Sequence, residues 1–394
     1  MKHRIVILGA GYAGATAAGR LAKRLHRDDV EITLVNADPD FVERVRLHQI
    51  ATGQDLPVRP LQTLFAGTGV RVRIAWVTAV DTNRQVVTLT DDNGTETLGY
   101  DTLVYALGST ITDYGVPGVA EHAYNVAGKQ AALRVRARLA ELGEGAKVLV
   151  AGAGLTGLEV AAEIAEARPD LEVAIAARGG IGDWLDEKAQ QYLRGAFERL
   201  GITVHAGTDI ARVDADGATT STDGFLPAHM TVWTAGFTAH PLAAATTLAL
   251  SDDGRIVVDA TQRSVSHANV YALGDAAHAA GVGGKTLRMG CATAMPMAWL
   301  GADALAARLT GREVPDAPIG YNSQCISLGR RDAVVQEVTK EDQPTSEVAV
   351  GRKAARKKEL ICKVTVWAIK HPTMLKPSRR RHLSVTPEPA ALPA

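Results

Sequence analysis

The chain has 394 residues, 46% of them hydrophobic, which is enough for two or three domains with buried cores. Its 43 basic and 43 acidic residues balance, so no overall field marks it as a nucleic-acid binder. Its three cysteines, Cys291, Cys325 and Cys362, have neither zinc-ligand spacing nor a disulfide framework, and no apolar run reaches the roughly 18 residues of a membrane-spanning helix. We therefore expect a cytoplasmic protein with buried or inert thiols and no metal centre.

A glycine loop near the start of the chain lies between an apolar run and a stretch of helix formers. Ile5–Leu8 is typical of a strand buried on both faces, and Ala15–Leu25 favours a helix. Between them, Gly9 permits a tight turn, Gly11 lets a pyrophosphate approach the backbone, and Gly14 lets helix and strand pack closely. This pattern predicts a nucleotide-binding unit with the phosphates at the helix N-terminus.

The second strand of this unit, Ile32–Val35, ends on Asn36. The pattern usually has an acid here that holds a ribose hydroxyl; asparagine can still bond a ribose, but it carries no charge that repels a 2′-phosphate. A secretory signal peptide is the alternative interpretation of the first residues, because the basic Met1–Arg4 precedes an apolar stretch and small residues. Secretion would remove the glycine loop, so we favour the nucleotide-binding unit.

Arg44, Arg46 and His48 form a cluster close behind this strand. These groups are candidates for contacting phosphates or a flavin ring, and a solvated basic turn is the alternative. Farther along, the buried strand Tyr100–Leu107 ends on Gly108, where a backbone can pass close to a ligand.

The segment between these two features is expected to be β-structure. Val70–Ala75 and Val77–Thr90 alternate as strands do, and Asp91–Gly94 is typical of a hairpin turn.

The strand–loop–helix pattern recurs in the middle of the chain. An apolar strand, Lys147–Val150, precedes Gly152, Gly154 and Gly157, and the helix Leu158–Ala167 follows. One such loop is a weak signal, but two in the same context predict two dinucleotide-binding units.

The second unit also closes as the first one does, because the strand Met230–Ala235 ends on Gly236. Its own second strand, Glu172–Ala177, is followed by Arg178 and not by an acid. An arginine there accommodates the 2′-phosphate of NADP, and a solvated loop arginine is the alternative.

A late strand, Val270–Leu273, stops at Gly274 and Asp275 before a run of helix formers, and a further helix is expected from Met295 to Leu309. An aspartate at such a strand end can accept a hydrogen bond from a sugar or ribityl hydroxyl. The same short segment also fits an ordinary turn and helix cap.

In their order, these motifs resemble the set found in flavoprotein reductases with two dinucleotide-binding domains, over roughly residues 2–311. The motifs that carry the resemblance are Gly9–Gly14, Tyr100–Gly108, Gly152–Glu159, Trp233–Gly236 and Tyr271–Ala276. The resemblance implies an α/β fold with two Rossmann-like domains in a glutathione-reductase-like arrangement and a smaller C-terminal region. It implies an FAD-binding domain made of residues 1–114 and 237–320, and an NADH- or NADPH-binding domain, 115–236, inserted between these halves.

By the same resemblance, Glu159 sits where the family places an acid beside the nicotinamide. No residue is named as catalytic, because the cofactor carries the chemistry. The implied FAD contacts are Gly9, Gly11, Ala13, Gly14, Asn36, Arg44, His48, Ala106, Gly108, Gly274 and Asp275. The implied NAD(P)H contacts are Gly152, Gly154, Thr156, Gly157, Glu159, Arg178 and Gly236.

Type II NADH dehydrogenase-like proteins are the branch that the chain resembles most. Their Ala-Thr-Gly segment resembles His48–Gly53, and their Ser-Leu…Gly-Arg segment resembles Ser327–Arg330. Disulfide reductases need two thiols just after the first helix, where this chain has none, and sulfide:quinone oxidoreductases would fit only through Cys291 and Cys325. The chain departs from its branch in the uncharged end of its second strand and in Cys291–Met297, which replaces a glutamine-rich helix near the quinone.

The C-terminal region, 321–382, is expected to contain a basic amphipathic helix, followed by a disordered tail, 383–394, rich in Pro and Ala. Residues 351–382 hold eleven Lys and Arg residues against one acid, Glu359. Leu360, Val364 and Trp367 recur at helical spacing and form an apolar face, which suits a membrane surface with anionic lipid. A core-packed helix with a solvated face is the alternative.

The resemblance therefore implies an FAD-dependent oxidoreductase that takes hydride from NAD(P)H and passes electrons to a quinone or similar small-molecule acceptor. We expect it in the cytoplasm or on the inner face of the cell membrane, with a homodimer as one assembly and no nucleic-acid partner. A soluble flavoprotein reductase serving a redox protein or biosynthetic substrate is one alternative. A flavin-binding redox sensor is another.

Overall fold

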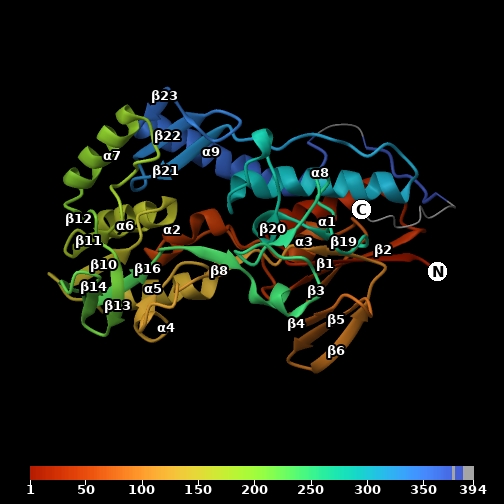
Figure 1. Ribbon diagram of the computed structural model, residues 1–394, viewed down its shortest axis with the longest axis horizontal. Helices are drawn as coiled ribbons and strands as arrows, with labels where there is room; N and C mark the ends of the chain where they lie inside the picture. Colours follow the sequence, from red (N-terminus) through yellow and green to blue (C-terminus); the bar gives the residue numbers. More distant parts are fainter. Residues whose placement is uncertain (375–377, 385–394) are drawn as a thin grey trace.

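The computed structural model describes residues 1–374 and 378–384, so residues 385–394 of the expected disordered tail lie outside the described part. A five-stranded parallel sheet with the order β19-β7-β1-β2-β3 forms the first unit (Figure 1). Its strands are β1 (His3–Leu8), β2 (Val30–Asn36), β3 (Val70–Ile74), β7 (Thr102–Tyr105) and β19 (Val270–Ala272). Because β19 comes from much later in the chain, two distant segments share one sheet.

A second five-stranded parallel sheet, at the left of Figure 1, has the order β12-β11-β10-β16-β9. Its strands are β9 (Ala123–Tyr124), β10 (Lys147–Ala151), β11 (Glu172–Ala176), β12 (Thr203–His205) and β16 (Met230–Trp233). The chain enters this unit through β8 (Ser109–Ile111) and leaves it through β17 (Phe237–Ala239), which pair antiparallel. This pair therefore connects the two units.

Helices cover both sheets, as parallel strands buried on both faces require. The helices of the first unit are α1 (Tyr12–Arg24), α2 (Leu47–Ala51), α3 (Leu61–Phe65) and α8 (Cys291–Leu309), and those of the second are α4 (Val119–His122), α5 (Lys129–Glu141), α6 (Leu155–Ala167) and α7 (Glu187–Arg199). The short helix α2 packs with α5 and α6 of the other unit. It therefore brings residues of the first unit to the second.

Small antiparallel elements complete the two units, together with one short parallel pair. The antiparallel elements are the sheet of β4 (Trp76–Asp81), β5 (Val86–Asp91) and β6 (Gly94–Gly99) and the sheet of β13 (Ile210–Asp214), β14 (Gly217–Thr220) and β15 (Phe225–Pro227). The parallel pair is β18 (Ile256–Val257) and β20 (Ala277–His278).

Helix α1 is buried along most of its length by the first sheet, α8 and the C-terminal helix. Small residues such as Ala17 and Ala298 lie in this core and allow α1 and α8 to approach closely. Arg20 of α1 donates to Asp303 of α8 at 2.6 Å, and Arg24 donates to the same carboxylate. The helix behind the first glycine loop is thus fixed by packing and by an ion pair.

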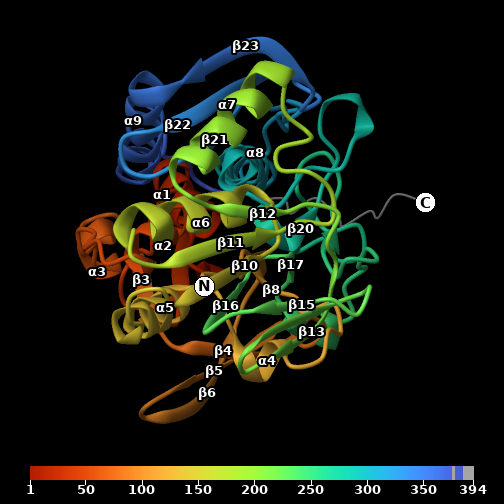
Figure 2. The ribbon, with the colours of Figure 1, turned by 90° about the vertical axis from the view of Figure 1, so that its left-hand side faces the viewer.

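The C-terminal region is a sheet of β21 (Ser323–Ser327), β22 (Ala333–Val338) and β23 (Pro344–Val350), followed by α9 (Gly351–Lys370). Both views place it on the same side of the molecule as α7 (Figure 1, Figure 2). Helix α9 buries the residues Ala354, Lys358, Cys362, Val366 and Ile369. Leu360, Val364 and Trp367 remain 61%, 43% and 38% exposed, so α9 packs on the core through a different face from the predicted apolar stripe.

Three expectations about local structure need correction. Val77–Thr90 is two strands, because the chain turns between β4 and β5, where Gln85 has φ +56°. The run after Asp275 is a short 3₁₀ turn and β20, and not a helix. Helix α8 begins at Cys291, before the expected Met295, because the N–H groups of its first turn already bond the Gly290 carbonyl.

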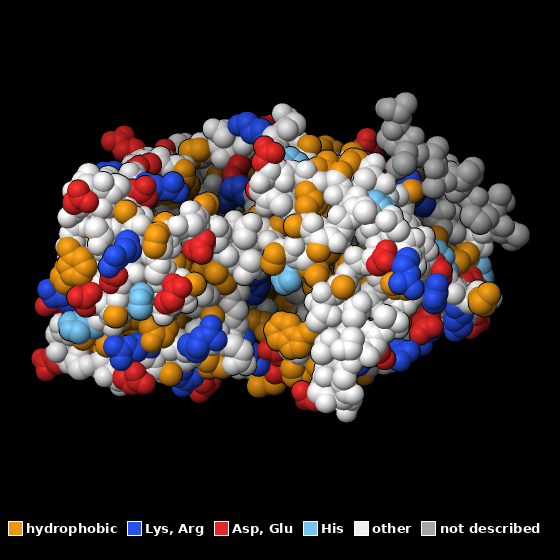
Figure 3. Space-filling view, turned by 60° about the horizontal axis from the view of Figure 1, so that its bottom comes forward, with side chains coloured by type: hydrophobic (Ala, Val, Ile, Leu, Met, Phe, Trp, Pro, Cys, Tyr) orange, Lys and Arg blue, Asp and Glu red, His pale blue; other side chains and the backbone are white. Residues whose placement is uncertain are grey.

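Among the described helices, none combines the length and the hydropathy that crossing a bilayer requires. On the face shown in Figure 3, acidic and basic side chains are interspersed. This distribution agrees with the balanced composition.

Candidate functional site

The glycine loop of the first unit lies at the carboxyl ends of β1 and β7. Gly9 has φ +91°, and a Cβ placed on it would lie 2.9 Å from the carbonyl carbon of Ala106. A Cβ on Gly14 would collide with the backbone of Gly9, so α1 begins directly against the strand end. A Cβ on Gly11, in contrast, would meet nothing within 4 Å. This open space beside the unpaired N–H groups of the first helical turn is the kind of place where a pyrophosphate binds.

Strand β19 brings Asp275 to the same edge. Gly274 has φ +66°, and a Cβ on it would lie 3.0 Å from the Cβ of Ala13 in α1. Asp275 Oδ2 accepts a hydrogen bond from Ser109 Oγ at 2.6 Å and lies 3.9 Å from Arg44 Nη1. Three distant segments of the chain therefore meet around the first glycine loop.

Asn36 uses both of its polar atoms inside the protein. Its Oδ1 accepts from the N–H of Ala10 in the glycine loop at 2.8 Å, and its Nδ2 donates to the carbonyl of Asp38 at 2.8 Å. The structure thus gives Asn36 a role in shaping the glycine loop.

The second unit repeats the geometry of the first. A Cβ on Gly152 would lie 2.6 Å from Ala235 Cα, and a Cβ on Gly157 would lie 2.7 Å from Thr234 Oγ1, whereas Gly154 again faces open space. A cavity of about 420 Å³ opens at this loop. It is lined by 151–156, 176–180, Trp184, 208–210, 233–237 and Met289.

Two opposite charges lie on the rim of this cavity. Arg178 Nε lies 3.9 Å from Asp209 Oδ1, and both side chains are largely exposed. The Arg178 guanidinium also lies over the ring of Tyr114, 5.9 Å from its centroid. Asp209 follows β12, so the acid that is missing after β11 comes from the neighbouring strand end.

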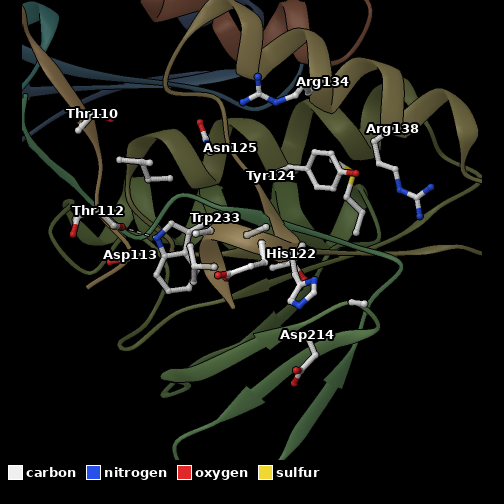
Figure 4. Close-up of a pocket in the computed structure, with 18 of the residues that line it drawn as sticks. Thr110, Thr112, Asp113, His122, Tyr124, Asn125, Arg134, Arg138, Asp214 and Trp233 are labelled. Carbon is white, nitrogen blue, oxygen red and sulfur yellow. Dashed lines mark hydrogen bonds between the residues drawn. The ribbon is translucent and has the colours of Figure 1, made fainter. Parts of the chain in front are cut away.

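A larger cavity, of about 800 Å³, shares Trp233 with the 420 Å³ cavity. Figure 4 shows Arg134 and Asn125 toward one end of this cavity and Asp214 toward the other. Trp233 Nε1 donates to the carbonyl of Thr112 at 2.8 Å. Neither glycine loop contributes to this cavity, so we assign no dinucleotide to it despite its size.

A group of buried charged residues lies where α2, α6, β21 and α9 meet. The ammonium group of Lys358 on α9 pairs with Glu159 of α6 and donates to Ser327 Oγ at 2.7 Å. Glu159 Oε1 also accepts from the N–H of Ser327 at 3.1 Å. His48 Nδ1 on α2 lies 3.6 Å from Glu159 Oε2. The predicted contact Glu159 therefore faces the C-terminal region, and it does not line the 420 Å³ cavity.

The environment of this group shifts its ionisation. Burial lowers the pKa of His48 to about 4, which makes the imidazole neutral near pH 7. Burial alone would raise the pKa of Glu159, but the charge of Lys358 and the hydrogen bonds from Lys358 and the Ser327 N–H outweigh it, and the pKa lies below its usual value. Burial raises the pKa of Glu163, which Arg330 only partly offsets.

The Ser327–Arg330 segment docks on acids of α6. The N–H of Arg330 donates to Glu166 Oε2 at 2.6 Å, and Arg330 Nη1 lies 3.3 Å from Glu163 Oε1. On the other side, Glu359 of α9 pairs with Arg46 of the first unit at 2.9 Å. The C-terminal region is therefore tied to both units by charge pairs.

The cluster Arg44, Arg46 and His48 separates in the structure. Arg44 faces Asp275, whereas Arg46 is buried beside Glu43 and Glu359, and His48 is buried against α6. The alternative of a solvated basic turn is therefore wrong. Of these three residues, only Arg44 joins the first glycine loop.

Sequence reasoning missed Ser109, Asp209 and Lys358 as site residues. Lys358 shares the spacing of Ala354, Cys362 and Val366, every fourth residue on the buried face of α9, and this period is the one signal that marked it. For Ser109 and Asp209 the sequence holds no such signal, because each meets its partner only through the sheet topology.

The three cysteines are all free, with Cys291 exposed, Cys325 partly buried and Cys362 buried. Burial raises the pKa of Cys362, which keeps this thiol protonated. Of the expected buried or inert thiols, Cys291 is thus not buried, and inertness stays the prediction for it.

Two Rossmann-type units, each with a glycine loop at the carboxyl edge of a parallel sheet, define a two-nucleotide oxidoreductase fold. A model of the pyridine nucleotide-disulphide oxidoreductase family matches residues 3–299, and the chain belongs to this family.

Named relatives agree with this class. The demethylphylloquinone reductase NdbB of Synechocystis sp. is 28% identical over 351 residues, which is 85% of this chain and 86% of that protein. The type II NADH:quinone oxidoreductase NdhA of Mycobacterium tuberculosis is 30% identical over 329 residues, 72% of this chain and 68% of that protein. Among solved structures, NDH2 from Plasmodium falciparum in complex with NADH has a TM-score of 0.77 at 14% identity, covering 96% of this chain and 99% of that one. The predicted family and fold class are confirmed.

Proposed function

We propose that this protein is a flavoprotein that oxidises NAD(P)H and reduces a quinone; two of its relatives are named a demethylphylloquinone reductase and a type II NADH:quinone oxidoreductase. The observation that carries the proposal is the repeated glycine-loop geometry, one copy completed by Asp275 and the other opening on a cavity. When bound, FAD accepts the hydride and passes electrons on to the acceptor.

The first unit fits FAD. Gly11 leaves space for a pyrophosphate at the start of α1, and Asp275 and Arg44 offer an acceptor and a cation at the adjoining edge. Tyr12 Oη, in the first turn of α1, is buried and has no hydrogen-bond partner among the described residues. Since buried polar atoms are usually paired, such an atom favours a bound polar group.

The second unit fits NAD(P)H. Gly154 and Thr156 line its cavity at the N-terminus of α6, where a pyrophosphate meets unpaired N–H groups. Gly236 follows β16 and lines the cavity, and its lack of a side chain makes room for the ring of Tyr114.

An acceptor screen tests this function against its rivals. The flavin-loaded protein should oxidise NADH with a soluble naphthoquinone in steady state, and flavin bleaching by NADH should be faster than turnover. Turnover with a redox protein but with no quinone would favour a soluble reductase. Flavin reduction without turnover on any acceptor would favour a redox sensor.

We also propose that α9 rests on an anionic membrane surface. Leu360, Val364 and Trp367 form an exposed apolar stripe, flanked by basic side chains that are exposed as well. Basic residues near anionic lipid each contribute about 1 kcal/mol, and buried apolar area adds to this. The protein would then lie on the inner face of the cell membrane.

Liposome flotation with the double variant Leu360→Ser and Trp367→Ser tests this proposal. Truncation at Val350 is a poor test, because it removes Lys358 and leaves Glu159 buried without its partner. The variant should float less than wild type on anionic liposomes, and salt should weaken wild-type binding. Equal flotation, with a dimer in wild type that the variant loses, would assign the stripe to a second copy.

We propose the same domain limits as the sequence implies. Residues 1–114 with 237–320, 115–236 and 321–382 would be the FAD, NAD(P)H and C-terminal parts. The pairing of β8 with β17 at the two crossings supports these limits.

A further inference from the structure

The rim of the second cavity holds a pair of charges from two neighbouring strand ends. Arg178 follows β11 and Asp209 follows β12. The N–H of Thr208 donates to the carbonyl of Ala177 at 2.8 Å, which fixes the two loops side by side. Both charged side chains line the cavity, and 3.9 Å separates Arg178 Nε from Asp209 Oδ1.

We infer that Asp209 is a specificity-determining residue that disfavours NADPH relative to NADH. The inference rests on the proposed function, since it takes the cavity to hold a pyridine dinucleotide. The end of the second strand is where such units meet the adenosine ribose, whose 2′ position carries a hydroxyl in NADH and a phosphate in NADPH. Asp209 stands at this place beside Arg178, the one cation among the described residues that line the cavity.

The carboxylate acts on a 2′-phosphate in two ways. It draws the guanidinium of Arg178 toward itself, so the cation is less available to the phosphate. It also repels the phosphate directly, whereas it accepts a hydrogen bond from a 2′-hydroxyl. Both effects weaken the binding of NADPH, and neither weakens the binding of NADH.

Tyr114 is the second neighbour of Arg178 on the rim. The guanidinium lies over the Tyr114 ring, and a Cβ on Gly236 would lie 2.7 Å from this ring, so Tyr114 covers the connecting strand end beside the cavity. Arg178 thus lies over the rim, between an aromatic face and a carboxylate.

The size of the effect follows from exposure. The side chains of Arg178 and Asp209 are 69% and 60% exposed, and exposed pairs are weak and sensitive to salt. Removal of the charge from Asp209 should therefore tighten NADP⁺ binding by roughly threefold to tenfold at low salt.

The experiment compares NAD⁺ and NADP⁺ binding to the oxidised, FAD-loaded protein, so that no turnover occurs. Quenching of tryptophan fluorescence reports binding, because Trp184 and Trp233 line the cavity. In Asp209→Asn, the Kd for NADP⁺ should fall roughly threefold to tenfold while that for NAD⁺ stays equal or rises. Asp216→Asn is the matched control, because Asp216 is an exposed acid of the same unit outside the cavity lining, and it should change neither Kd.

The double variant Asp209→Asn with Arg178→Ala separates the two effects. In the absence of Arg178, Asp209→Asn should lower the Kd for NADP⁺ by a smaller factor. The decrease that remains measures the direct repulsion between Asp209 and the 2′-phosphate. Equal changes in both Kd values, or none, would overturn the inference. If Asp209→Asn selectively lowers the Kd for NADP⁺ but the protein reduces no quinone, only the proposed function would be defeated.

Discussion

Lys358 and Glu159, 199 residues apart in the sequence, form a buried ion pair that joins α9 to α6. Their side chains are only 11% and 12% exposed, and Ser327 bonds both of them. The C-terminal region is therefore held on the nucleotide-binding units by this ion pair. Loss of either charge alone would leave the other one buried without a partner.

Removal of one partner should destabilise the protein strongly. We expect Lys358→Met to lower the free energy of unfolding by about 3–5 kcal/mol, because Glu159 would stay buried without a counter-charge. Urea unfolding of the FAD-loaded protein measures this loss. The double variant Lys358→Met with Glu159→Leu should recover much of it.

The neighbouring lysine is a matched control. Lys357 pairs with Glu337 on the surface, where its side chain is 46% exposed. Lys357→Met should cost no more than about 1 kcal/mol. Equal losses at Lys357 and Lys358 would show that helix α9, and not the buried pair, is what the substitutions disturb.

The glycine loops allow FAD and NAD(P)H binding to be separated from folding. Gly11→Val should leave the fold intact, because its Cβ meets open space, and should abolish FAD binding by filling the pyrophosphate position. Gly154→Val should do the same to NADH binding while the protein stays yellow. Flavin absorbance and nucleotide titration read the two sites.

Gly14→Ala is the contrasting variant. Its Cβ would collide with the backbone of Gly9, so α1 must shift and the protein should lose about 1–3 kcal/mol of stability.

If Gly11→Val retains full FAD while Gly154→Val loses it, the two cofactor assignments must be exchanged.

Stability should fall in mild acid because of His48. Its pKa of about 4 in the folded protein lies below the ordinary 6.5, so between these values only the unfolded chain binds the proton. The stabilisation is thus complete above about pH 6.5 and is lost as pH falls toward 4, by about 2 kcal/mol at pH 5. His48→Gln should show a smaller loss of urea midpoint between pH 7 and pH 5 than wild type does. An unchanged pH dependence would mean that His48 titrates normally.

Arg178 should matter for NADPH alone. A charge-assisted bond to phosphate is typically worth about 1.5–3 kcal/mol, so Arg178→Ala should lower kcat/KM for NADPH by roughly tenfold and barely change that for NADH. Sequence alone favours NADPH use at least comparable to NADH use, and Asp209 reduces that preference. Both cofactors need assay with one quinone at one ionic strength. Equal loss with both would make Arg178 a general rim residue.

Local sequence determined the two nucleotide-binding units. Glycines at fixed offsets between an apolar run and a helix former admit few backbone solutions, so the spacing of Gly9, Gly14, Gly152 and Gly157 is enough to predict close helix–strand contacts, and the structure has them. Strands β7 and β16 each end three residues before the predicted glycine, Gly108 or Gly236.

Only the tertiary structure decided how charged residues are partnered. Lys358 looks like one basic residue among eleven, and Asp209 lies in an ordinary loop, because neither local spacing nor composition reveals a partner on another strand or helix. Sheet order places β12 beside β11, and the packing of α9 places Lys358 against α6. Pairing between charges depends on distance in space, which the fold sets after the local pattern is satisfied.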